Sequence, residues 1–185
     1  AGFAMLLLGI ESAHDKTLKA MGKGFDTARI RKYLAVLRRH AMFLNGYFIL
    51  GNIGESRSEM EQIVPFAHEL GLDTIMLSAL RHSPFSGLTD LVAQNPGYHI
   101  APNGKIYSDH CPLPELKALR RQLYQRFYSR RQILRIANKA RHSGLLKIIL
   151  SQGAGHSVNF LRAFGLTWRR GRRPHASGPA VVSSG

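Results

Sequence analysis

The chain has 185 residues, of which 44% are hydrophobic and 20% are charged, and it contains one cysteine, Cys111. This composition excludes a disordered chain and an internal disulfide. The apolar run "FAMLLLGI" at 3–10 is too short to cross a bilayer, so we expect a soluble, cytoplasmic protein with one main domain.

Charge is distributed unevenly along the chain. Residues 1–116 hold 11 basic and 11 acidic residues, whereas residues 117–185 hold 15 basic residues and no acidic one, which gives a net charge of +15. A basic block of this kind favours an anionic partner, such as RNA, DNA, a phosphate-rich ligand or an acidic protein surface. A solvated face that keeps the protein in solution is an equally good interpretation, and the sequence leaves both open.

The first eighty residues predict three strands. The apolar runs at 3–10, 43–51 and 72–80 are typical of parallel strands that are buried on both faces. Helical patterns lie between them, which gives the βαβαβ arrangement of a parallel sheet with right-handed crossovers. Ligands of such folds bind at the carboxyl ends of the strands. Glycines and polar residues are concentrated at the carboxyl ends of the three predicted strands, at 9–12, 51–55 and 80–83.

The two helices between these strands have recognisable ends. The first should begin at a cap formed by Asp26 or Thr27. The second should begin at a capping box, the Ser-x-x-Glu pattern formed by Ser56 and Glu59. Pro65 lies inside the apolar stripe of the second helix and should kink or shorten it, because proline cannot donate a helical hydrogen bond.

The alternation of strands and helices ends after residue 83. The stretch 86–97 predicts at most a short helix, and 98–107 predicts a hairpin around Asn103-Gly104. A long helical stretch runs from Pro114 to about residue 140, with Ser129 as the cap of its second part. The expected apolar stripes are Leu116, Leu119, Leu123 and Phe127, and then Ile133, Leu134 and Ile136. A further helical pair is expected at 143–164.

Three segments, in this order and spacing, resemble the second half of a radical SAM barrel: "LLLGIESAHDKTLKAMGKG", "GYFILGNIGES" and "AHELGLDTIMLSAL". They are most similar to the cobalamin-associated group, such as the anaerobic magnesium-protoporphyrin ester cyclases. The segment "YSDHCPLPELKALRRQLYQRFYSRRQILRIANKA" is similar to the helical region after that barrel. The resemblance covers residues 3–140. It implies an α/β fold, a partial TIM-like barrel of three parallel βα units with an α-helical C-terminal extension.

The resemblance divides the chain into four expected parts. These are a half barrel at 1–97, a hairpin connector at 98–113, a basic helical extension at 114–168 and a disordered tail at 169–185. A half barrel would leave strand edges exposed, which favours oligomerisation unless the C-terminal helices cover them.

The resemblance also implies an S-adenosylmethionine site with seven members: Glu11, Ser12, Lys23, Gly51, Gly54, Glu55 and Leu80. The residues after the first strand lie where the family binds the ribose and amino acid portions of the cofactor. Those after the second strand lie beside its adenine, and the end of the third approaches adenine or substrate. Lys23 matches a basic position that could pair with the carboxylate of the cofactor.

Each of these site residues also has a structural interpretation. Glu11 could solvate a loop or cap the next helix, and Gly51 and Gly54 could serve only as turn residues with positive φ. Glu55 could support the N-terminus of the following helix through the helix dipole. Nine histidines are present, but none has the spacing of metal ligands, so we expect no metal site within this chain.

Two features depart from the family. The defining Cys-x-x-x-Cys-x-x-Cys motif is absent, and three thiolates are needed to hold a 4Fe–4S cluster. The pair Ala13-His14 and the stretch "HSPFSGL" also replace the usual residues, which affects the expected substrate contacts. We therefore expect the C-terminal piece of a longer radical SAM oxidoreductase or methyltransferase-type enzyme. Its partners would be the missing N-terminal half of the barrel and a small-molecule substrate, and the sequence leaves open whether cobalamin is a further cofactor.

The alternative is a module that binds RNA or a protein through the basic region 117–173. Arginines alternate there with Tyr124, Phe127 and Tyr128, and aromatic rings beside arginines can stack on bases. Phe127 falls on the apolar stripe, however, which favours a core position. On either hypothesis the chain by itself should be catalytically inactive.

Overall fold

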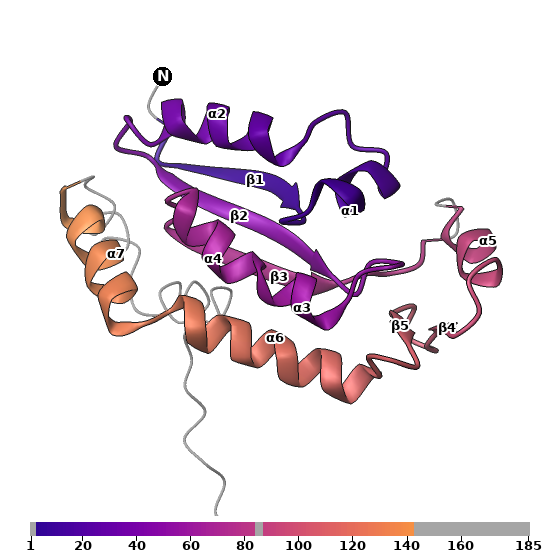
Figure 1. Cartoon of the computed structure of the whole chain (residues 1–185). Coiled ribbons are helices and arrows are strands. Elements are labelled where there is room, and N and C mark those ends of the chain that lie inside the picture. The colour runs from indigo at the N-terminus through magenta and orange to yellow at the C-terminus, as the bar shows by residue number, and fades with distance from the viewer. Residues whose placement is uncertain (1–2, 84–86, 143–185) are drawn as a thin grey trace, which may run out of the picture.

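A computed structural model describes residues 3–83 and 87–142 (Figure 1). Its centre is a sheet of three parallel strands in the order β1-β2-β3, namely β1 (Met5–Glu11), β2 (Phe43–Leu50) and β3 (Thr74–Ala79). The predicted α/β class, the three strands and their parallel direction are therefore confirmed. Closure into half of a TIM-like barrel stays a prediction. The helical pair and the tail expected after residue 142 lie outside the described residues.

Four helices connect the strands: α1 (Asp15–Ala20), α2 (Thr27–Leu37), α3 (Arg57–Glu61) and α4 (Ile63–Glu69). The main core joins buried side chains of the sheet to those of the helices, among them Ile30, Leu34, Phe48, Ile63, Ala67 and Ile75. The sequence did not predict α1. This helix has six residues and buries only Thr17 and Leu18, too few to produce a helical period.

The predicted helix ends are confirmed. Asp26 accepts a hydrogen bond from the backbone N–H of Arg29, and Ser56 and Glu59 form the complete capping box. The predicted second helix is divided at Gln62, three residues before Pro65. Pro65 has no N–H for the carbonyl of Glu61 and its ring would clash there, so α3 ends at that residue.

The C-terminal part also follows the predicted order. It contains α5 (Leu88–Ala93), the antiparallel hairpin of β4 (Tyr98–Ile100) and β5 (Ile106–Ser108), α6 (Leu113–Phe127) and α7 (Arg130–His142). The predicted stripe of α6 is buried in full: Leu116, Leu119, Leu123 and Phe127. In the described part of the chain, no helix has the length and apolar character needed to cross a membrane.

Helix α6 runs beside the outer edge of β3 and provides hydrogen-bond partners for it (Figure 1). The hydroxyl of Tyr124 accepts a hydrogen bond from the N–H of Leu77 at 2.9 Å. The hydroxyl of Tyr128 lies 3.2 Å from the N–H of Ile75 and 3.3 Å from its carbonyl. Tyr124 and Tyr128, which the sequence offered as candidates for stacking on RNA bases, thus provide hydrogen-bond partners for backbone groups at the edge of β3. This lowers the tendency of that edge to pair with another chain.

The face of helix α7 that is buried differs from the one predicted from sequence. Ile133 and Leu134 were expected on the buried stripe, but they are 45% and 70% exposed. The helix instead turns Gln132 inward, where its amide donates to the carbonyls of Leu72 and Asp73 at 3.1 and 2.9 Å. Arg135 also donates to the Leu72 carbonyl, and Lys139 forms an ion pair with Asp73 at 2.6 Å. Polar groups at the start of β3 therefore decide which face of α7 is buried.

We expect Tyr124→Phe to lower the free energy of unfolding by about 1–3 kcal/mol, the cost of leaving the buried N–H of Leu77 without a partner. Urea unfolding followed by circular dichroism measures this loss. Tyr107→Phe is the matched control, because within the described residues the Tyr107 ring makes a tilted contact with the His99 ring but its hydroxyl has no hydrogen bond. An equal effect of the two variants would contradict the role of Tyr124 at the strand edge.

Candidate functional site

The carboxyl ends of the three strands lie at one edge of the sheet, and Glu11 closes the first of them. Its φ of 69° is the only positive value of a non-glycine residue in the described part of the chain, and the register of β1 against β2 shifts between Gly9 and Glu11. This conformation costs an ordinary side chain on the order of 1–2 kcal/mol. Strain of this kind is concentrated at functional sites, where the surrounding structure maintains it.

The side chain of Glu11 is held but not fully satisfied. Its Oε1 accepts a hydrogen bond from the Lys23 ammonium at 3.1 Å, and the carboxylate side chain is only 13% exposed. Its Oε2 is buried and has no hydrogen-bond partner within the described residues. A Cβ atom at Gly9 would come within 3.0 Å of Oε1, so the glycine provides room for the carboxylate. One buried acceptor oxygen is therefore left without a hydrogen-bond partner among the described residues.

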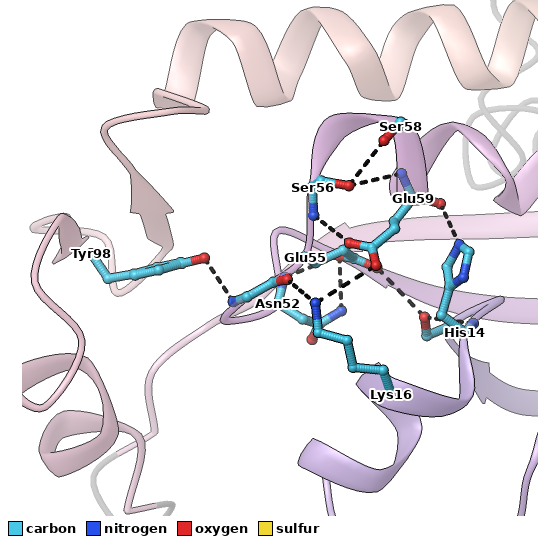
Figure 2. A network of polar contacts seen from close by, with 10 residues as sticks. His14, Lys16, Asn52, Glu55, Ser56, Ser58, Glu59 and Tyr98 are labelled. Carbon is cyan, nitrogen blue, oxygen red and sulfur yellow. Dashed lines mark hydrogen bonds and ion pairs between the residues drawn. The ribbon is translucent and has the colours of Figure 1, made fainter.

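Ser12 connects the first strand end to the second. It is fully buried, its hydroxyl donates to Oε1 of Glu55 at 3.5 Å, and the same hydroxyl oxygen accepts from the N–H of His14 at 3.2 Å. Figure 2 shows the wider polar network around Glu55. The predicted members at these two strand ends, Ser12 and Glu55, thus lie in contact.

The Glu55 carboxylate closes the turn that follows β2. Its Oε2 accepts hydrogen bonds at 3.1 Å from the N–H groups of Gly51 and Asn52 and from the Asn52 amide (Figure 2). Burial nevertheless raises the pKa of Glu55 to about 7, and these hydrogen bonds oppose the shift only in part. The side chain thus stabilises the turn directly, whereas the structural interpretation from sequence had it supporting α3.

Gly54 joins this turn to two other parts of the chain. Its N–H donates to the hydroxyl of Tyr98 at 2.7 Å, and its carbonyl accepts from the Lys16 ammonium at 3.0 Å (Figure 2). The φ angles of Gly51 and Gly54 are 76° and 75°, which agrees with the turn role expected from sequence. Their contact with a cofactor stays a prediction.

Not all seven predicted residues are connected. Hydrogen bonds join Glu11 to Lys23, and Ser12 and Gly51 to Glu55. Leu80 is engaged elsewhere, because its N–H donates to Leu50 in β2 and its carbonyl accepts from Ile106 in β5. The structure thus gives two adjacent groups at the strand ends, linked through the Glu11–Ser12 peptide.

Four residues of this network were not predicted from sequence: His14, Lys16, Asn52 and Tyr98. The Nε2 of His14 donates to the carbonyl of Glu59 at 3.1 Å, and Lys16 lies 3.7 Å from the Glu59 carboxylate (Figure 2). Asn52 is 4% exposed, and its Oδ1 has no partner within the part of the chain that is described. Its place between two glycines of a strand-end turn was a usable signal, whereas Tyr98 is distant in sequence and gave none.

The polar side chains that the structure describes at the strand ends do not form a set of metal ligands. Within residues 3–83 and 87–142, no three His, Cys, Asp or Glu side chains come together in a way that could hold a metal ion. Cys111 is buried and reduced, and burial raises the pKa of its thiol. The donors and acceptors available at the strand ends are therefore carboxylate, hydroxyl, amide and ammonium groups.

No model of a known protein family matches the chain. The chain is 26% identical over 153 residues to an uncharacterized methyltransferase, PH0819, of Pyrococcus horikoshii. The aligned region covers 78% of this chain and 33% of that protein. It is 33% identical over 75 residues to the protein YhcC of Escherichia coli K12. That aligned region covers 40% of this chain and 24% of YhcC. The chain spans a third or less of the length of these curated relatives. It is thus a mixed α/β chain with weak similarity to a methyltransferase.

Proposed function

We propose that the chain is the C-terminal part of a radical SAM enzyme of the methyltransferase or oxidoreductase type, and that its strand ends bind S-adenosylmethionine. Glu11 carries this proposal, since it is a strained carboxylate at the carboxyl end of a parallel strand, mostly shielded from solvent and with one buried, unsatisfied oxygen. The weak similarity to a methyltransferase is compatible with the same cofactor.

The groups at the first strand end match the polar groups of S-adenosylmethionine. Its methionine part carries an ammonium and a carboxylate, and its ribose carries two hydroxyls. The free Oε2 of Glu11 can accept from the ammonium or from a ribose hydroxyl. The Lys23 ammonium, already 3.1 Å from Glu11, can pair with the carboxylate. The two side chains would then orient the cofactor through opposite charges.

The chain does not fit a 4Fe–4S cluster, because it holds one cysteine and such a cluster needs three thiolates in this family. In the proposed enzyme the cluster ligands, and any cobalamin domain, would belong to segments outside this chain. The residues at the strand ends would bind and orient S-adenosylmethionine and would carry out no redox step. The chain alone would be inactive.

We expect Glu11→Gln to weaken the binding of S-adenosylmethionine about tenfold to a hundredfold, because a charge-assisted hydrogen bond contributes about 1.5–3 kcal/mol. Isothermal titration calorimetry of the chain with S-adenosylmethionine measures this change. Glu61→Gln is the matched control, since Glu61 is a partly exposed acid on α3 that pairs with Arg57 at 3.2 Å. Equal affinities for the two variants would contradict the role of Glu11.

The radical SAM assignment has a separate test in the gene. If the reading frame continues upstream of Ala1 and encodes Cys-x-x-x-Cys-x-x-Cys within about 100–200 residues, the size of a missing half domain, the assignment is supported. A frame that closes just upstream would contradict it while leaving S-adenosylmethionine binding to be judged by calorimetry.

A second candidate function is nucleic-acid or protein binding through the basic region 117–173. Exposed arginines without an ion pair in the described part of α6 and α7 favour it: Arg121, Arg126, Arg130 and Arg131. Because Tyr124 and Tyr128 are occupied at the β3 edge, this binding would depend on charge rather than stacking. Affinity for mixed-sequence RNA should then fall steeply as salt rises, and an absence of binding at low salt would exclude this function.

A further inference from the structure

A pocket of about 390 Å³ lies between the hairpin and α6, outside the group formed by Glu11 and Ser12. Figure 1 shows the hairpin close to the first turns of α6. Asn103 and Lys105, in the turn that precedes β5, line the pocket on the hairpin side. Its lining has an apolar part and a basic part. The apolar part consists of Leu50 and Ala79 at the ends of β2 and β3 and of Leu113, Pro114 and Leu116 from α6.

The basic part consists of Lys105, Lys117 and Arg120, with the amide of Asn103 beside them. None of these three cations has an ion pair with a residue that the structure describes. Lys105 and Arg120 are also partly buried. A partly buried charge without a partner is unfavourable, so a binding anion would relieve a cost that the free protein carries.

The remaining polar groups at this pocket favour an anion as well. The Oδ1 of Asn103 accepts from the N–H of Lys105 at 3.1 Å, which leaves the amide N–H groups of Asn103 to donate. The first turn of α6, at Leu113 and Pro114, contributes the positive end of a 15-residue helix. Glu115 is the acid of this turn, and it lies 3.9 Å from Arg57, which is not among the lining residues.

We propose that this pocket binds a free organic phosphate of nucleotide size. The cations and the Asn103 amide would hold the phosphate, and the apolar wall formed by Ala79, Leu113 and Pro114, which are partly or fully exposed, would hold the organic part. The volume lies within the range of small-molecule sites. A cationic surface that only attracts polyanions needs no apolar wall. This inference uses none of the seven residues assigned to S-adenosylmethionine, although Leu50 and Ala79 directly precede Gly51 and Leu80 of that set.

Calorimetric titration of the whole chain with ADP, adenosine and pyrophosphate tests the proposal. We expect saturable binding of ADP and weaker binding of adenosine and pyrophosphate, each of which lacks one half of the recognised groups. Arg120→Gln should weaken ADP binding about tenfold or more. Lys105→Gln, in the hairpin, is a second variant that should do the same without altering α6.

Arg121→Gln is the matched control, since it removes the same charge from the next residue of the same helix and does not line the pocket. It should change ADP affinity less than twofold, a factor worth about 0.4 kcal/mol. Equal losses for Arg120→Gln and Arg121→Gln would overturn the proposal. So would saturable binding of a short single-stranded RNA without any binding of ADP, which would assign these cations to a polyanion.

Discussion

A Phe127→Ala variant is expected to lose about 3–5 kcal/mol of the free energy of unfolding, a larger loss than that expected for Tyr124→Phe. Phe127 is fully buried at the end of α6. Its ring stacks on His68 of α4 with centroids 4.8 Å apart, and it meets Tyr128 edge-on at 5.0 Å. Domains of this size are stabilised by about 5–15 kcal/mol, so the variant would lose a large share of that total.

Urea unfolding followed by circular dichroism measures the loss. Leu134→Ala is the control, because Leu134 is a large apolar residue on the neighbouring helix that is 70% exposed. It should cost less than about 1 kcal/mol. A comparably small loss for Phe127→Ala would mean that α6 does not pack on α4 through this ring.

The second large effect concerns pH and Glu55. Burial raises the pKa of this carboxyl group from 4.5 to about 7 in the folded chain. A raised pKa means that folding favours the protonated form, so its stabilising contribution is complete below pH 4.5 and is lost as pH rises to about 7. The shift corresponds to about 3 kcal/mol across this range.

Glu55→Gln isolates this contribution, because the amide oxygen can still accept from the N–H groups of Gly51 and Asn52. We expect the variant to gain stability relative to the natural chain as pH rises from about 5 to 7, and the difference to stay constant above about pH 8. Burial lowers the pKa of His68, which acts in the opposite direction in this range, so the comparison must be made between variants. A difference that does not vary with pH would contradict the assignment.

Much of the fold could be predicted because its signals are local. The strands are continuous apolar runs, the caps at Asp26 and Ser56 are adjacent to the helices that they begin, and the stripe of α6 has a clear helical period. The face that α7 buries could not be predicted in this way. Its orientation depends on carbonyls of Leu72 and Asp73 that are distant in sequence, and these hydrogen bonds outweigh the burial of Ile133 and Leu134.

The candidate site could likewise be predicted from sequence only in part. Its position at the strand ends follows from the parallel sheet, and the sequence predicted Glu11 and Glu55 there. The strained backbone of Glu11, its ion pair with Lys23 and its free oxygen appear only in three dimensions. Tyr98, which binds the turn at Gly54 from the hairpin, could not be found from its own neighbours in sequence.

The most direct test of the central claim is a titration of the isotopically labelled chain with S-adenosylmethionine, followed by two-dimensional amide NMR. The account predicts that the amides of Glu11, Ser12 and Lys23 shift in a saturable manner, and that Glu11→Gln raises the S-adenosylmethionine concentration needed for these shifts about tenfold or more. Shifts confined to other parts of the molecule, or a complete absence of shifts in the folded chain, would contradict it.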